Sequence, residues 1–177
     1  MNIKQIVRTN LRESNLGREL LFQYKKLTNK IPDPDLNFPE LMSLEIASSC
    51  NLSCIHCPPH MKEFKYEVRK FGLMEIELFN RLMDEIDNYG ERRIALHKDG
   101  EPLMHPKIEL ILDRVKRNNN HTVYITTNAH YLTENVSQAI LRNRINVLNL
   151  SIGAATEEFY SKVRGKNFNK VINNDLL

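Results

Sequence analysis

Residues 42–57 read MSLEIASSCNLSCIHC, a short strand pattern that runs directly into a cluster of cysteines. Apolar and polar side chains alternate in its first half, as they do along a β-strand. Its second half holds all 3 cysteines of the chain, Cys50, Cys54 and Cys57, in the spacing C-x3-C-x2-C. Three thiolates on one short loop can each ligate one iron of a [4Fe–4S] cluster, which leaves the fourth iron without a protein thiolate. The stretch therefore predicts a strand followed by a metal centre with an open coordination position.

A structural zinc site is the main alternative for these cysteines. An odd number of closely spaced cysteines favours metal binding over disulfides, but it does not by itself select iron. In a Cys3His zinc site, His56 or His60 would supply the fourth ligand. Both interpretations stay open on spacing alone, whereas three unrelated buried cysteines would require chance to place them all on one loop.

Downstream of the cysteines, segments with helix and strand periodicity alternate along the chain. Further strands are expected at 92–96, 121–127 and 145–152, and helices at 76–89, at 108–115 and from Thr133 and Thr156 onward. The strand at 145–152 is apolar on both faces, which is typical of a buried parallel strand. The helix after Thr133 is expected to bury Val136, Ile140 and Leu141. This alternation predicts an α/β fold with a parallel sheet and right-handed crossovers, whose strand-end loops gather at one rim.

The proline-rich segment divides the chain into two expected regions. Residues 1–40 form a helical N-terminal extension that ends in the proline-rich linker IPDPDLNFP at 31–39, because three prolines there cannot continue a helix. Residues 41–177 form the α/β core. Residues 62–70, which mix aromatic and basic side chains, are expected to be a flexible loop at the mouth of the site.

The cysteine loop resembles the signature of the radical S-adenosylmethionine (SAM) superfamily, which has an aromatic residue where this chain has His56. The resemblance implies a [4Fe–4S] cluster on Cys50, Cys54 and Cys57 that binds SAM through its fourth iron. It also implies reductive cleavage of SAM to a 5′-deoxyadenosyl radical, which abstracts hydrogen from a substrate. In such enzymes the cofactor carries the chemistry and the protein positions it.

Three further motifs follow the later strands and strengthen the resemblance. The family has a G-G-E-P-like turn that holds the SAM amino group, and the matching residues here are Gly100, Glu101 and Pro102, with Asp99 in place of the first glycine. Its T-N-G turn corresponds to Asn128, with Ala129 replacing glycine. The stretch 151–165 is similar to the S-[IL]-D-[GA]…Y…R-G pattern of the subgroup with peptide- and sugar-modifying members. There a serine and an arginine contact the SAM carboxylate, which assigns that role to Ser151 and Arg164, while Gly153 replaces the aspartate.

The length of the chain qualifies this interpretation. The family's core has six βα units, and only about four are expected here, so the resemblance implies a partial radical SAM barrel that is truncated after the fourth unit. The fourth strand would then expose unpaired backbone groups at the sheet edge, and we expect a partner or a second copy to cover it. A fragment of a longer enzyme, or an inert homologue that only binds a cluster, is the corresponding alternative.

Charge and hydropathy narrow the possible partners. The 25 lysines and arginines are interspersed with 22 aspartates and glutamates, and the net charge is +3, so neither nucleic acid nor an anionic membrane surface is an expected partner. No apolar run approaches a membrane span and residues 1–10 lack the apolar core of a signal peptide, so we expect a cytoplasmic protein. The resemblance implies an electron donor such as a flavodoxin or ferredoxin. It leaves the substrate open among peptides, sugars and cofactor precursors.

Overall fold

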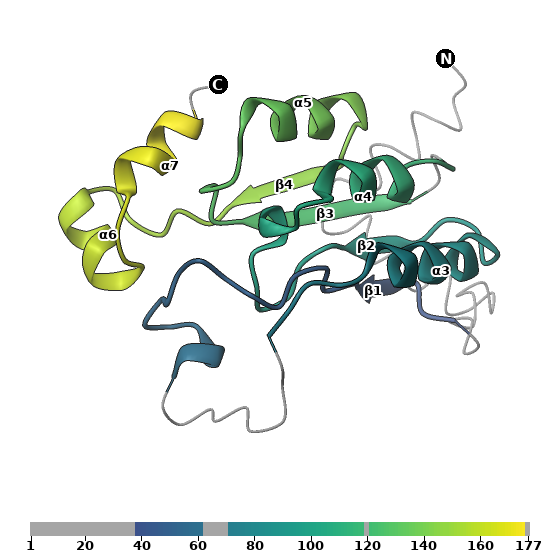
Figure 1. The fold of residues 1–177 in the computed structure, drawn as a ribbon, viewed down its shortest axis with the longest axis horizontal. Helices are drawn as coiled ribbons and strands as arrows, with labels where there is room; N and C mark the ends of the chain where they lie inside the picture. The colour runs from purple at the N-terminus through teal and green to yellow at the C-terminus, as the bar shows by residue number, and fades with distance from the viewer. Residues whose placement is uncertain (1–37, 62–70, 119–120, 176–177) are drawn as a thin grey trace, which may run out of the picture. The chain divides into compact units, whose positions relative to one another are not determined.

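Four parallel strands form one sheet, in the order in which they occur along the chain. The computed structural model describes residues 38–61, 71–118 and 121–175, and the sheet has the order β1-β2-β3-β4 (Figure 1). The register aligns Met42 with Ile94, Ile94 with Val123, and Ile125 with Leu148. The strands are β1 (Leu41–Ser43), β2 (Arg93–Ala95), β3 (Thr122–Thr127) and β4 (Val147–Leu150).

A helical segment follows each of the last three strands, and another precedes β2. The helices are α3 (Ile76–Asp87), α4 (Ile108–Val115), α5 (Glu134–Arg142), α6 (Glu157–Val163) and α7 (Phe168–Asp175), with 3-10 turns η1 (Pro58–His60) and η2 (Pro102–Met104) in the loops. Helices α3, α4 and α5 pack side by side in chain order (Figure 1). The expected α/β fold with four parallel strands is confirmed.

Apolar residues at helical spacing explain why these segments bury one face. The expected inner residues of α4, Ile108, Ile111, Leu112 and Val115, are all buried, and so are Ile94, Val123 and Ile125 on the strands. Each such aliphatic side chain contributes about 1.5–3 kcal/mol when it leaves water. In α5, Thr133 caps the N-terminus through a hydrogen bond from Val136 N, at 3.4 Å.

Three local predictions are wrong. Leu141 is 75% exposed, and Ala139 takes the expected inner position on α5. Strand β4 is half-buried to exposed instead of fully buried. It has β3 as its only strand neighbour in the described sheet, so its outer edge is uncovered by any described strand. The sequence also predicted one helix after β4, whereas α6 and α7 are separated by Gly165, whose φ of 125° favours glycine.

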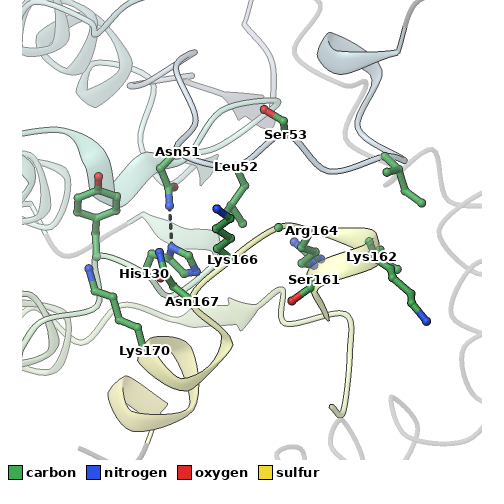
Figure 2. A pocket seen from close by; sticks show the side chains of 14 residues that line it. Asn51, Leu52, Ser53, His130, Ser161, Lys162, Arg164, Lys166, Asn167 and Lys170 are labelled. Carbon is green, nitrogen blue, oxygen red and sulfur yellow. Dashed lines mark hydrogen bonds between the residues drawn. The ribbon is translucent and has the colours of Figure 1, made fainter. Parts of the chain in front are cut away.

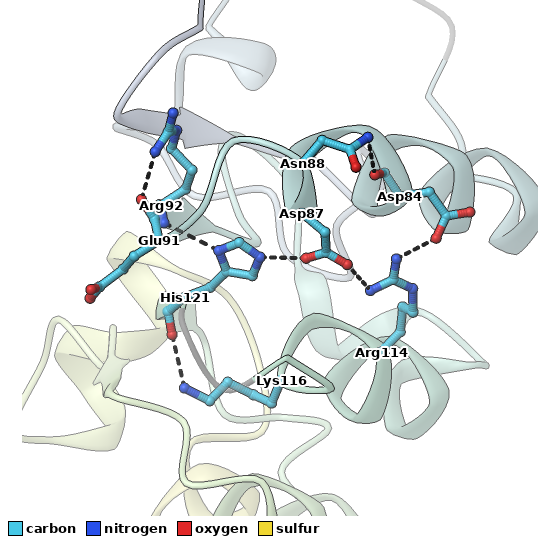
Figure 3. Close-up of polar contacts among 8 residues, drawn as sticks. All are labelled: Asp84, Asp87, Asn88, Glu91, Arg92, Arg114, Lys116 and His121. Carbon is cyan, nitrogen blue, oxygen red and sulfur yellow. Dashed lines mark hydrogen bonds and ion pairs between the residues drawn. The ribbon is translucent and has the colours of Figure 1, made fainter. Parts of the chain in front are cut away.

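Polar side chains at the amino ends of the strands connect the sheet to its helices (Figure 3). Arg114 on α4 is buried and donates to Asp84 Oδ1 at 2.6 Å and to Asp87 Oδ2 at 2.9 Å. The second oxygen of Asp87 lies 2.7 Å from His121 Nε2. His121 Nδ1 accepts from the backbone N–H of Arg92, so Nε2 carries the proton that reaches Asp87. This network lies at the opposite end of the strands from the cysteine loop and serves stability.

Two expected regions lie outside the described residues. The N-terminal extension at 1–40 does so except for its last three residues, and the loop at 62–70 does so entirely. Both therefore stay predictions. Within the described part of the chain, no helix is long and apolar enough to cross a membrane.

Candidate metal and cofactor site

The cysteine loop follows β1 at the rim where the parallel strands end. Cys54 is buried, and Cys50 and Cys57 are half-buried. Cys57 N donates to Cys54 O at 3.1 Å, which closes a tight turn, and Pro58 then opens η1. Ile55 N donates to Val163 O at 3.0 Å, so the middle of the loop is attached to the end of α6. The loop thus presents all three thiols at a fixed place on the rim.

The environment of the thiols suits a cationic centre. Burial raises the pKa of Cys50, and the nearby negative charges of Glu101 and Cys54 raise it further. Burial also raises the pKa of Cys57, with contributions from Cys54 and Cys50. Thiolates that oppose one another's ionisation in this way become stable together when metal cations neutralise them.

The described residues contain no three or more His, Cys, Asp or Glu side chains that converge as ligands of a single metal ion. His56 and His60, the two candidate fourth zinc ligands, are exposed. In a [4Fe–4S] cluster each thiolate binds a different iron, so the sulfurs remain apart.

The Gly-Glu-Pro turn follows β2 and packs against the cysteine loop. A Cβ on Gly100 would stand 2.1 Å from Ala47 O, so only glycine fits at this position. Glu101 N donates to Ser49 O at 2.9 Å, and Pro102 begins η2. Asp99 does not adopt the left-handed backbone that would demand glycine, and its N–H donates to Glu45 Oε1 at 2.9 Å. An aspartate at position 99 is thus compatible with the turn.

The carboxylate of Glu101 connects two loops. It is 2% exposed and accepts hydrogen bonds from Leu103 N at 3.0 Å, Thr127 Oγ1 at 2.6 Å and Asn128 N at 2.7 Å. Burial raises the pKa of Glu101, and these three donors oppose that rise. The carboxylate therefore holds the turns after β2 and β3 together, and its predicted contact with the SAM amino group stays a prediction.

Asn128 stands beside the first cysteine. Its Nδ2 donates to Asn51 Oδ1 at 2.9 Å and lies 3.8 Å from Cys50 Sγ. Ala129, the next residue, has φ of 65°, the left-handed backbone for which glycine is the usual residue. The turn that the sequence identified at Asn128 thus forms with alanine in the glycine position.

Ser151 and Arg164 are brought together, as the motif predicted. Arg164 Nη2 donates to Ser151 Oγ at 2.8 Å, and Nη1 lies 3.8 Å from Cys54 Sγ. Its Nε is buried and has no hydrogen-bond partner among the described residues. A guanidinium group suits the bidentate recognition of a carboxylate.

A single cleft of about 230 Å³ unites these parts. It is lined by the three cysteines and by every predicted cofactor-binding residue except Pro102, namely Gly100, Glu101, Asn128, Ser151 and Arg164. Residues from the loops after all four strands therefore face one space. The sequence had assigned them to that rim, but it could not show that their side chains line a common cleft.

Two histidines that line the clefts, His97 and His130, were not assigned to the site by the sequence analysis. His97 follows β2, lines the cleft, and accepts from Thr126 N at 3.0 Å through Nδ1. His130 follows β3 and is buried, with Nδ1 2.8 Å from Asn51 Nδ2 and Nε2 3.0 Å from the Tyr160 hydroxyl. The available signal was their position, since each histidine comes just after a predicted strand.

A second and larger cleft, of about 560 Å³, is lined in part by residues of the cysteine loop (Figure 2). Asn51 and Ser53 of that loop line it together with His130. Its other wall comes from the α6–α7 region and carries the basic side chains of Lys162, Arg164, Lys166 and Lys170. The cysteine loop thus borders two clefts, and Leu52 and Arg164 line both of them.

Comparison with known proteins gives one family. The family described as the Radical SAM superfamily matches residues 44–174. A GTP 3',8-cyclase of Microcystis aeruginosa is 24% identical over 131 residues, which are 73% of this chain and 39% of that protein. The chain therefore spans well under half the length of this relative.

Solved structures share the fold. BtrN in complex with AdoMet and 2-DOIA is 25% identical with a TM-score of 0.55, over 68% of this chain and 48% of BtrN. Streptococcus suis SuiB bound to precursor peptide SuiA has a TM-score of 0.61 at 18% identity, over 90% of this chain and 35% of SuiB. At that identity the second likeness concerns the fold alone.

Proposed function

Because the chain belongs to the radical SAM superfamily, we propose that it binds a [4Fe–4S] cluster through Cys50, Cys54 and Cys57 and cleaves SAM at that cluster. The observation that carries this proposal is the common cleft, which the three cysteines share with Gly100, Glu101, Asn128, Ser151 and Arg164. When reduced, the cluster supplies the electron that splits the S–C5′ bond of SAM into methionine and a 5′-deoxyadenosyl radical, which takes hydrogen from a substrate.

The protein's own residues bind and orient. The three thiolates would hold the cluster, and with three protein thiolates the fourth iron would be available to the methionyl group of SAM. Arg164 Nη2 and Ser151 Oγ, which are 2.8 Å apart, are placed to receive the methionyl carboxylate. Glu101 fixes the loops after β2 and β3, so that Asn128 and the backbone at Gly100 keep their places at the cleft. The electron comes from a donor such as a flavodoxin or ferredoxin.

Anaerobic reconstitution with iron and sulfide tests the proposal. The wild-type protein is expected to turn brown, with cluster absorption in the visible range, and to release 5′-deoxyadenosine after dithionite and SAM are added. Replacement of Cys54 by alanine is expected to abolish both signals, whereas His60→Ala is expected to leave both unchanged. One bound zinc ion that is lost in His60→Ala would support the zinc site instead, and a cluster without 5′-deoxyadenosine would support an inert homologue.

A further inference from the structure

Two of the three cysteine sulfurs have a side-chain N–H donor next to them. Asn128 Nδ2 lies 3.8 Å from Cys50 Sγ, and Arg164 Nη1 lies 3.8 Å from Cys54 Sγ. Both distances suit N–H···S hydrogen bonds, which are longer than those to oxygen. The donors come from different elements, Asn128 from the turn after β3 and Arg164 from the end of α6.

The orientation of the Asn128 amide is fixed by its neighbours. Its Oδ1 accepts from the backbone N–H of His130 at 3.0 Å, so Nδ2 must be the atom that faces Cys50. The same Nδ2 donates to Asn51 Oδ1, and that bond fixes the Asn51 amide in turn. If the Asn128 amide flipped, its NH₂ group would face the backbone N–H of His130, and that donor would be left without an acceptor.

The chain of bonds continues to a buried tyrosine. Asn51 Nδ2 points at His130 Nδ1, which therefore accepts, and Nε2 carries the proton toward the Tyr160 hydroxyl (Figure 2 shows the Asn51–His130 bond). His130 is 3% exposed and Tyr160 is fully buried. Burial lowers the pKa of His130, as does the charge of Lys170, which agrees with this neutral form. Asn51, His130 and Tyr160 are therefore positioning residues that act through Asn128.

We propose that Asn128 and Arg164 set the reduction potential of the cluster by donating hydrogen bonds to the sulfurs of Cys50 and Cys54. This inference rests on the cluster of the proposed function and goes beyond it. Reduction from [4Fe–4S]2+ to [4Fe–4S]1+ adds one electron and hence one negative charge. Donors and a cation at the ligand sulfurs stabilise the more negative state, so they make the cluster easier to reduce.

A redox titration followed by electron paramagnetic resonance, without SAM, tests the inference. Asn128→Asp keeps the oxygen that accepts from His130 N but replaces the donor at Cys50 with an acceptor. Arg164→Met removes the donor and the charge at Cys54. Each is expected to disfavour reduction at least tenfold, which is a shift of about 59 mV to more negative potential for one electron.

Matched variants separate hydrogen bonding from charge. Asn149→Asp introduces the same charge change on β4, where Asn149 bonds to Thr126 Oγ1 and to no cysteine. Lys162→Met removes a charge from α6, where Lys162 pairs with Glu158. Each control is expected to shift the potential by less than half as much as its counterpart.

Several outcomes would overturn the inference. The inference is wrong if Asn128→Asp and Arg164→Met have the same reduction potentials as their controls. That result would leave the proposed function intact. Loss of the cluster from both variants, with cluster-free proteins that unfold at the wild-type temperature, would show that the residues serve assembly instead of tuning. A wild-type protein that takes up no cluster would overturn the proposed function together with this inference.

Discussion

Gly153 lies directly against the guanidinium group of Arg164. A Cβ on Gly153 would stand 2.5 Å from Arg164 Nε and 2.9 Å from Nη2, and its φ of 71° is itself unfavourable for other residues. Arg164 fills the space that a side chain at 153 would need. This explains how the chain can differ from the resembling motif, which has aspartate there, and still place Arg164 beside Ser151.

Gly153→Ala is expected to displace Arg164 and so weaken SAM binding at least tenfold. The methyl group collides with the guanidinium group, and the left-handed backbone adds about 1 kcal/mol of strain. Calorimetric titration of SAM into the reconstituted protein measures the affinity. Gly90→Ala is the matched control, because Gly90 has φ of 76° and nothing within 4 Å of the added methyl. Equal affinities in the two variants would exclude Arg164 as a SAM contact.

Glu101→Gln is expected to lower the free energy of unfolding by about 1–3 kcal/mol. The NH₂ group of glutamine would replace one carboxylate oxygen, and the buried donor that this oxygen serves would lose its acceptor. The carboxylate serves three donors, and the amide has only one acceptor oxygen. Urea unfolding of the cluster-free chain measures the change. Glu109→Gln on the exposed face of α4 should stay within about 0.5 kcal/mol of wild type. A stable Glu101→Gln protein would show that the two loops do not depend on this carboxylate.

Stability at acid pH is expected to depend on Asp87. Burial raises the pKa of this carboxyl, but the bonds from His121 and Arg114 outweigh that effect, so the net shift is downward. A carboxyl with a lowered folded-state pKa stabilises the fold above its unfolded pKa, near 4, and loses that contribution as the pH falls through the folded value.

Asp87→Asn is therefore expected to cost about 3 kcal/mol at pH 7 and to flatten the loss of stability below about pH 4. Thermal unfolding between pH 3 and pH 7 measures both effects. Asp113→Asn is the comparison, because the pKa of Asp113 is also lowered, mainly by Asn143, but its side chain is 49% exposed. Surface pairs contribute much less. If the stability of Asp87→Asn falls as steeply below about pH 4 as that of the wild type, Asp87 is not the group responsible for the acid dependence.

Arg144→Gly is expected to stabilise the protein by about 0.5–1 kcal/mol. Arg144 follows the C-cap of α5 with φ of 49°, and its N–H bonds to Leu141 O while Ile145 N bonds to Ile140 O. This Schellman ending favours glycine at the left-handed position. Arg144→Ala, which keeps the Cβ, should bring no gain, and a comparison of the two melting temperatures decides the point.

Local patterns in the sequence predicted the helices and strands well. The inner face of α4, the start of α5 after Thr133 and the position of the cysteine loop after β1 follow from short-range periodicity and spacing, and all three appear as expected. Prediction failed where burial depends on neighbours distant in sequence. Leu141 is apolar at helical spacing yet exposed, and β4 reads as a central strand but lies at the described edge.

For the site too, some features could be predicted from the sequence and others could not. The sequence by itself determined which residue types stand at the ends of the strands: three cysteines, a Gly-Glu-Pro turn, Asn128, Ser151 and Arg164. Only the tertiary structure decided what those residues touch, such as Glu101 joining two loops, Asn128 turned toward Cys50, and Arg164 filling the space above Gly153. The physical reason is that hydrogen-bond direction and close packing depend on sheet register and loop path, which bring together residues up to 110 positions apart.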